Sequence, residues 1–192
     1  MARKVTVNPY FYLILPATLL VLPLRWVLAW MLAVTVHEVG HYFALRLCRV
    51  PIQALEITPF GIRMHTGCLT NWEVLLCSLA GPFGGLILIR LSRFLPYTAI
   101  CAFLQAIFNL IPIYPLDGGR ALRAMLSLVI RREITISIIE NLIILPVAGL
   151  IWYFLWRFDL GIVPTLLIYG IFAQKFLANR RKNGYNRGKN DF

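Results

Sequence analysis

The sequence predicts an all-α polytopic membrane protein with about six transmembrane helices and a short membrane-associated β-hairpin between the second and third helices. Of the 192 residues, 59% are apolar and 14% are charged, whereas soluble domains are about 45–50% apolar and about 25% charged. The apolar residues gather in runs close to the ~20 residues that cross a bilayer. The basic residues lie mostly between these runs. An ordinary soluble domain is therefore excluded.

Six apolar runs are expected to form the helices. The first is short and contains Pro16 and Pro23, and we expect a retained helix there, because a small-residue cleavage signal is not evident. Residues 1–178 then form one membrane domain, and residues 179–192 form a basic, disordered cytoplasmic tail. The expected helices are Tyr10–Leu24, Trp26–Leu45, Trp72–Leu91, Phe94–Leu116, Ile134–Trp156 and Leu160–Leu177.

The segment Pro51–Leu69 separates the second and third apolar runs and is predicted to form the hairpin. Ala54–Thr58 and Ile62–Thr66 have strand-like composition, and Pro59-Phe60-Gly61 lies between them as a turn. Non-helical backbone at membrane depth is tolerated only against protein or a water-filled cavity. We therefore expect the hairpin to border a cavity.

The distribution of Lys and Arg predicts the orientation. With six spans and a cytoplasmic N-terminus, 15 of the 19 basic residues fall on the cytoplasmic side and 4 on the other. The sequence thus predicts a multi-pass protein of the cell membrane with both termini cytoplasmic. The net charge of +11 then reflects topology and contact with the lipid bilayer, and we expect no nucleic-acid partner.

The second run contains the sequence His37-Glu38-Val39-Gly40-His41. Residues four apart lie on one face of a helix, so both imidazoles can reach one metal ion with Glu38 beside it. This is the H-E-x-x-H arrangement of zinc sites. A carboxylate at this depth costs about 2.5 kcal/mol or more without a cavity or partner. The competing interpretation is a structural polar cluster that joins helices.

A third protein ligand is needed, and Asp117 is the preferred candidate. Pro112 and Pro115 interrupt the helix before it and two glycines follow it, which favours a locally irregular segment. The second and fourth spans run in the same direction, so Asp117 is expected at the depth of the histidines. In the third span, Gly81 and Gly85 form a G-x-x-x-G that is expected to let it approach the zinc helix. The other candidate ligands are Glu56, Glu73, Glu133, Glu140, Asp159, Asp191 and His65.

These residues resemble the site-2 protease family of intramembrane zinc metalloproteases. That family pairs H-E-x-x-H with N-x-x-P-x-x-x-L-D-G in a later helix, which matches Asn109–Gly118, and Ser78–Pro82 resembles its small-residue motif. The resemblance covers residues 27–125, the expected catalytic core. It implies one Zn²⁺ per chain held by His37, His41 and Asp117, with Glu38 as general base and Asn109 as oxyanion donor.

Within that family the chain most resembles the stage IV sporulation branch, without its CBS domain. The resemblance rests on Leu55–Gly61 after the zinc helix and implies regulated intramembrane proteolysis of a membrane-tethered protein, such as a pro-sigma factor. A membrane regulatory partner is a further expectation. The alternatives are a metal or ion transporter and a non-catalytic membrane binding partner. The hairpin is expected to bind an unwound substrate segment as an added strand, through Thr58, Pro59, Phe60, Gly61 and Ile62.

Overall fold

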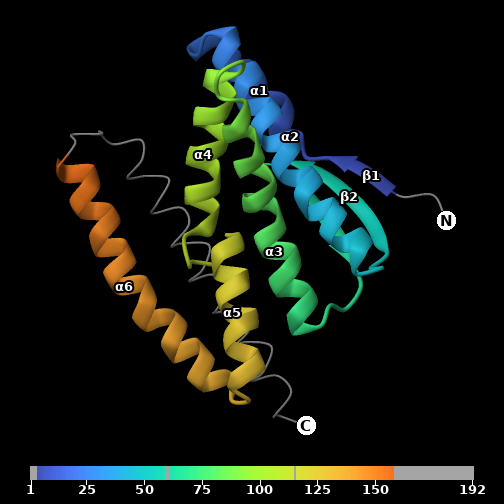
Figure 1. The fold of residues 1–192 in the computed structure, drawn as a ribbon, viewed down its shortest axis with the longest axis vertical. Coiled ribbons are helices and arrows are strands. Elements are labelled where there is room, and N and C mark those ends of the chain that lie inside the picture. Colours follow the sequence, from blue (N-terminus) through green and yellow to red (C-terminus); the bar gives the residue numbers. More distant parts are fainter. Residues whose placement is uncertain (1–3, 59–60, 115, 158–192) are drawn as a thin grey trace. The chain divides into compact units, whose positions relative to one another are not determined.

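The computed structural model describes residues 4–58, 61–114 and 116–157. The chain consists of two compact units, residues 1–133 and residues 134–192. The first unit contains all the described helices and strands except the last helix. The helices and strands are drawn in Figure 1. In chain order they are β1 (Lys4–Val7), α1 (Pro9–Val21), α2 (Leu24–Leu47), β2 (Ile52–Thr58), β3 (Gly61–Thr66), α3 (Asn71–Leu86), the 3₁₀ helix η1 (Ile87–Leu91), α4 (Pro96–Leu110), α5 (Asp117–Val129) and α6 (Glu133–Arg157).

Two of the described helical segments are long and apolar enough to cross a membrane. They are Asn71–Leu91, which joins α3 and η1, and Glu133–Leu150 in α6. The 13 residues of α1 are fewer than the ~20 that cross a bilayer. The expected sixth helix and the basic tail lie outside the described residues. The count of six therefore stays a prediction.

The exit of α2 turns the chain toward the sheet. The N–H of Val50 donates to the carbonyl of Leu45 at 2.9 Å, and the N–H of Arg49 donates to that of Arg46 at 3.1 Å. This is the Schellman arrangement, in which the residue after the cap adopts a left-handed conformation. Arg49 adopts it, with φ 56°. After this reversal of the chain, β2 begins at Ile52, which packs against Ala44 and Leu45 of α2.

The predicted hairpin is present, and a third strand extends it. β2 and β3 pair antiparallel, while β1 pairs parallel with β2 from Lys4–Ala54 to Val7–Ile57. The sheet order is β1-β2-β3, so among the described strands β3 has a partner on one side only. The expected helical fold with a hairpin is confirmed in part: the described residues are mostly helical, and the hairpin belongs to a three-stranded sheet whose first strand, β1, was not predicted. A four-residue strand whose partner is distant in sequence has too weak a local pattern to be predicted.

The helices around α3 approach one another closely. α2 packs against α3 and α4, and α3 also packs against α4 and α5, as Figure 1 shows. A Cβ on Gly40 would lie 2.4 Å from the carbonyl oxygen of Ala80, and one on Gly84 would lie 3.3 Å from the Cα of Gly40. The expected pairing through Gly81 and Gly85 was partly wrong. Gly81 does face α2, whereas the nearest atom to a Cβ on Gly85 is the carbonyl oxygen of Ala102 on α4.

The expected helix Phe94–Leu116 ends early. α4 stops at Leu110, because Pro112 follows and cannot continue the helical hydrogen bonds. Residues 111–114 and 116 are not helical, so the expected irregular segment lies before Asp117. The expectation of irregular backbone after it was wrong, because Asp117 and the two glycines that follow begin α5. A Cβ on Gly118 would lie 2.1 Å from the carbonyl oxygen of Leu110. The glycine thus permits α5 to start against the end of α4.

The helices α2 and α4 begin at the same end of the first unit. The rings of Trp26 and Tyr97, near the two helix starts, lie 4.8 Å apart in an edge-to-face arrangement. The guanidinium of Arg25 lies 5.2 Å from the centre of the Tyr97 ring. The two helices therefore run in the same direction, as the topology argument predicted, and their later turns reach the same depth.

Candidate metal centre

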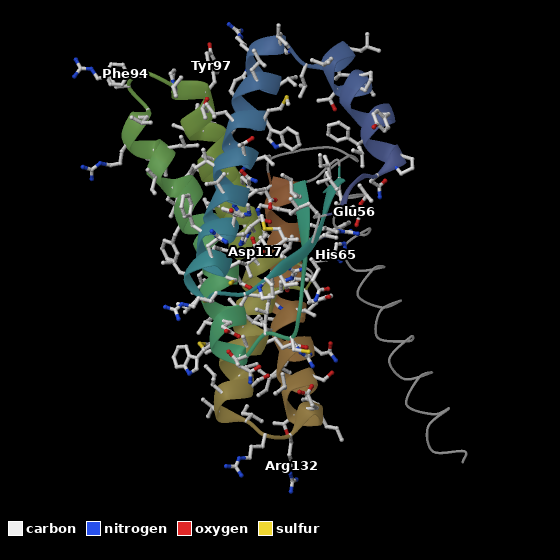
Figure 2. The ribbon with its side chains drawn as sticks, turned by 90° about the vertical axis from the view of Figure 1, so that its right-hand side faces the viewer. Glu56, His65, Phe94, Tyr97, Asp117 and Arg132 are labelled. Carbon is white, nitrogen blue, oxygen red and sulfur yellow. The ribbon has the colours of Figure 1, made fainter. Side chains whose placement is uncertain are left out.

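Two histidines of α2 and the first residue of α5 meet inside the first unit. The Nε2 atoms of His37 and His41 each lie 3.2 Å from Oδ2 of Asp117, and they lie 3.1 Å from one another. His37 is 3% exposed and Asp117 is 8% exposed. Figure 2 shows Asp117 between the end marked by Phe94 and Tyr97 and the end marked by Arg132. The sequence-predicted ligands are thus brought together in a buried cluster.

The main chain of α3 sets the protonation of His41. Its Nδ1 lies 2.7 Å from the carbonyl oxygen of Cys77. Because a carbonyl oxygen only accepts, Nδ1 carries the proton, and Nε2 of the neutral ring presents a lone pair. That lone pair faces the carboxylate of Asp117. The Nε2 lone pair of His41 and the carboxylate oxygen of Asp117, 3.2 Å apart, would repel one another unless a cation binds to both.

The donor set fits zinc. Tetrahedral zinc with bonds of about 2.0–2.1 Å holds its ligand atoms roughly 3.3 Å apart, close to the 3.1–3.2 Å triangle of the three donor atoms. Two imidazoles and one carboxylate leave a fourth position for water, as in catalytic zinc sites. The Nδ1 of His37 is buried and has no hydrogen-bond partner in the described part of the chain. The cluster is therefore a possible zinc site.

Gly81 shapes the site from α3. A Cβ at this position would lie 2.2 Å from Nε2 and 2.4 Å from Cε1 of His41. The imidazole thus occupies the space that any other side chain would fill. Gly81 belongs to the small-residue motif Ser78–Pro82. The sequence indicated that this motif packs closely against another helix, but not that the imidazole of His41 is its partner.

Asn109 projects from α4 beside the ligands. Its Nδ2 lies 3.4 Å from Nε2 of His37, so an amide donor stands next to the metal centre. Gln105, one turn earlier on the same helix, also lines the cavity. Its Oε1 is buried without a hydrogen-bond partner among the described residues. Sequence reasoning missed Gln105, for which the i, i+4 spacing from Asn109 is the available signal.

Glu38 is half-buried and lies against the hairpin turn. A Cβ on Gly61 would lie 2.4 Å from Oε1 of Glu38, and the backbone N–H of Ile62 faces the carboxylate. The start of β3 therefore reaches Glu38, and β3 borders a cavity, as the sequence predicted for the hairpin.

A cavity of about 660 Å³ opens from the metal centre. Strand β3 lines one side, and one face of α5 lines another through Asp117, Arg120 and Ser127. Residues on this face of α5 recur every three or four positions, as on an amphipathic helix. The three candidate ligands, Glu38, Asn109 and strand β3 thus line one cavity.

The other candidate ligands of the first unit have different partners. Glu56 lies 3.9 Å from Arg63 and 3.5 Å from His65, and Figure 2 shows Glu56 and His65 side by side on the sheet. Glu73 forms the capping box of α3 with Thr70, and Glu133 pairs with Arg123.

The predicted hairpin residues are placed in part. Ile62 lines the cavity, whereas the hydroxyl of Thr58 donates to the carbonyl of Gly61 at 2.8 Å and so closes the turn. Pro59 and Phe60 lie outside the described residues, as do the candidate ligands Asp159 and Asp191.

Two comparisons of the sequence with known proteins found similar proteins. The model of Peptidase family M50 matches residues 86–152, a range that contains Asn109 and Asp117. The zinc metalloprotease MJ0392 of Methanocaldococcus jannaschii is 32% identical over 109 residues, which cover 50% of this chain and 32% of that protein. The match thus spans about a third of the relative's own length.

A solved structure shares the fold. The site-2 protease from Methanocaldococcus jannaschii superposes with a TM-score of 0.62 at 21% identity, over 90% of this chain and 89% of the other. At that identity the likeness shows the fold alone. The chain is thus similar to peptidase family M50 over residues 86–152 and to a zinc metalloprotease over half of its length, and it shares the fold of a site-2 protease.

Proposed function

We propose that this chain is an intramembrane zinc metalloendopeptidase that hydrolyses a peptide bond in or near the membrane-embedded segment of a membrane-tethered protein. The observation that carries the proposal is the buried triangle of His37, His41 and Asp117, with Glu38 and Asn109 beside it on one cavity. This combination supplies metal ligands, a base and a hydrogen-bond donor for one reacting carbonyl.

Each side chain of the site is proposed to have its own role in hydrolysis of the peptide bond. Zinc held by His37, His41 and Asp117 would supply a Lewis acid that polarises the scissile carbonyl and makes water nucleophilic near neutral pH. The carboxylate of Glu38 takes the proton of the attacking water and returns it to the leaving amine nitrogen. The amide of Asn109 donates a hydrogen bond to the carbonyl oxygen as negative charge grows on it.

The substrate is proposed to bind as an extended strand. A helical peptide has its carbonyls engaged in its own hydrogen bonds, so the cleaved segment must unwind first. β3 is an edge strand that lines the cavity through Ile62 and Met64. An added strand would satisfy the main-chain groups freed by unwinding. The buried acceptor of Gln105 faces the same cavity and would accept an N–H from the bound segment.

We further propose a membrane-tethered regulator as the substrate, with a pro-sigma factor as the case to test first. The support is the resemblance of Leu55–Gly61 to the sporulation branch. A membrane regulatory partner belongs to the same proposal, as does a role in regulated intramembrane proteolysis.

The proteolysis test uses the purified chain in proteoliposomes with a single-pass reporter and, separately, a pro-sigma-type reporter. Wild type should release product, and a zinc chelator should stop release. Glu38→Gln should retain zinc but lose about 10²–10⁴-fold of the rate, because an amide cannot accept the proton of the water. Wild-type-like cleavage by Glu38→Gln would refute the proposed role, and metal flux without cleavage would favour a transporter.

The proposed orientation places both termini and the hairpin in the cytoplasm, on the 15 to 4 division of basic residues. Single cysteines at Thr66, Asn71 and Leu95, in a background without other cysteines, test this. An impermeant thiol reagent added to intact cells should label position 95 and leave positions 66 and 71 unlabelled. The reverse pattern would invert the orientation.

A further inference from the structure

The first two residues of β3, Gly61 and Ile62, lie against the side chain of Glu38. Gly61 has φ +142°, a conformation that side-chain-bearing residues rarely adopt, and a Cβ there would lie 2.4 Å from Oε1 of Glu38. The backbone N–H of the next residue, Ile62, faces the same carboxylate. Steric room and a main-chain N–H from one dipeptide thus meet at one carboxylate.

A contact from the N–H of Ile62 to Glu38 is compatible with the pairing of β2 and β3. Ile62 pairs with Ile57, and Arg63 pairs with Glu56. Antiparallel pairs alternate between hydrogen-bonded and non-hydrogen-bonded. Because the N–H of Ile62 is directed to Glu38, the Ile57–Ile62 pair is the non-hydrogen-bonded kind. The contact therefore costs the sheet no ladder hydrogen bond.

The rest of the hairpin is anchored independently of Glu38. Ala44 and Leu45 of α2 form a buried cluster with Ile52 and Cys77, and Leu55 and Met64 of the hairpin pack against it. The hydroxyl of Thr58 closes the turn on the carbonyl of Gly61 at 2.8 Å. The base of the hairpin is thus fixed on α2, and this places its turn over Glu38 on the same helix.

We propose that Gly61 and Ile62 are positioning residues that hold the carboxylate of Glu38 in place for proton transfer. The inference rests on the proposed function of Glu38 as general base. A glutamate side chain loses rotamer freedom when it is fixed, and a main-chain donor on a packed hairpin fixes it. A base must come within about 2.6–3.2 Å of the proton that it takes. Gly61 is required because any side chain would occupy the space of Oε1.

Gly61→Ala tests the proposal, with Gly67→Ala as the matched control. A Cβ on Gly67 would make an ordinary contact, 3.7 Å from Nε2 of Gln53. Gly61→Ala should lower kcat by about 10²-fold, since a displacement near 1 Å has that effect, with KM and zinc content unchanged. Gly67→Ala should keep wild-type values. A rise in KM with normal kcat would overturn the proposal and assign Gly61 to substrate binding.

Amide hydrogen exchange tests the contact without any substrate. In Glu38→Ala the amide of Ile62 loses its acceptor and should exchange at least about tenfold faster than in wild type, with zinc or without it. The amides of β1, at the far edge of the sheet, should not change. Equal exchange of Ile62 in the two proteins would overturn the inference, and this arm also decides the matter if Gly61→Ala fails to fold. An active Glu38→Gln enzyme would instead refute the base, while the exchange result would still stand for the contact.

Discussion

Gly81→Ala should remove His41 from the metal centre although it adds only one methyl group. The added Cβ would lie 2.2 Å from Nε2 and 2.4 Å from Cε1 of His41. Ordinary contacts begin at 3.4 Å, so the ring would have to move by about 1.2 Å, the difference between 3.4 and 2.2 Å. Zinc–nitrogen distances tolerate about 0.2 Å around 2.0–2.1 Å. The displacement is several times that tolerance.

Relaxation of α3 does not avoid the loss. If α3 moved away to make room, the 2.7 Å hydrogen bond from His41 to the carbonyl of Cys77 would lengthen beyond hydrogen-bonding distance. Loss of such an orienting partner alone costs about 10–100-fold in metal affinity. Either response should weaken zinc binding by at least about tenfold.

The assay is competition for zinc between the purified protein and a fluorescent chelator, with a thermal unfolding curve for each variant. Gly85→Ala is the matched control, because it lies one turn further on the same helix and its Cβ would be 3.9 Å from the nearest atom. It should keep wild-type affinity and be up to about 1 kcal/mol more stable, since alanine favours helix over glycine. Wild-type zinc affinity in Gly81→Ala would refute the reasoning.

Two further predictions concern the sheet and the exit of α2. A hydrogen bond from the amide of Asn8 holds the pKa of Glu56 below its usual value of 4.5. The ionised Glu56 carboxylate therefore contributes its full share to the stability of the fold above pH 4.5, and this contribution is lost as the pH falls through the lowered pKa. Asn8→Ala should raise the pKa of Glu56 in a carboxyl NMR titration, and an unchanged value would contradict this assignment. Arg49→Gly should increase the free energy of unfolding by about 1 kcal/mol, because Arg49 has positive φ. Arg46→Gly, inside the helix, should decrease it by about the same amount, and destabilisation by both in thermal unfolding would count against the cap.

The cluster of candidate metal ligands was predictable because helix geometry and helix direction suffice to bring its residues together. A helix fixes the spacing of His37 and His41, whatever surrounds it. Asp117 follows from the parallel directions of two helices and from the proline that ends α4. The hairpin was likewise predictable, since its strands are adjacent in sequence and share a turn with Pro and Gly.

The remaining features depend on contacts that no local pattern encodes. α5 begins with Asp117-Gly118-Gly119, a poor helical sequence, and is stabilised there by close packing against the end of α4. The strand Lys4–Val7 depends on a partner far along the chain. The donor that reaches Glu38 is a main-chain group of Ile62, and every residue except proline carries that group. Such contributions leave no trace in residue type.

The hydrogen bond between His41 and the carbonyl of Cys77 has a consequence for mutational surveys. The acceptor is a peptide group, so replacing the thiol side chain by another small residue leaves it in place. An alanine scan would therefore report position 77 as a packing site beside Ala44 and Leu45. Its part in orienting a metal ligand would emerge only if the peptide bond itself were altered, for example by replacing this amide linkage with an ester, which weakens the carbonyl as an acceptor.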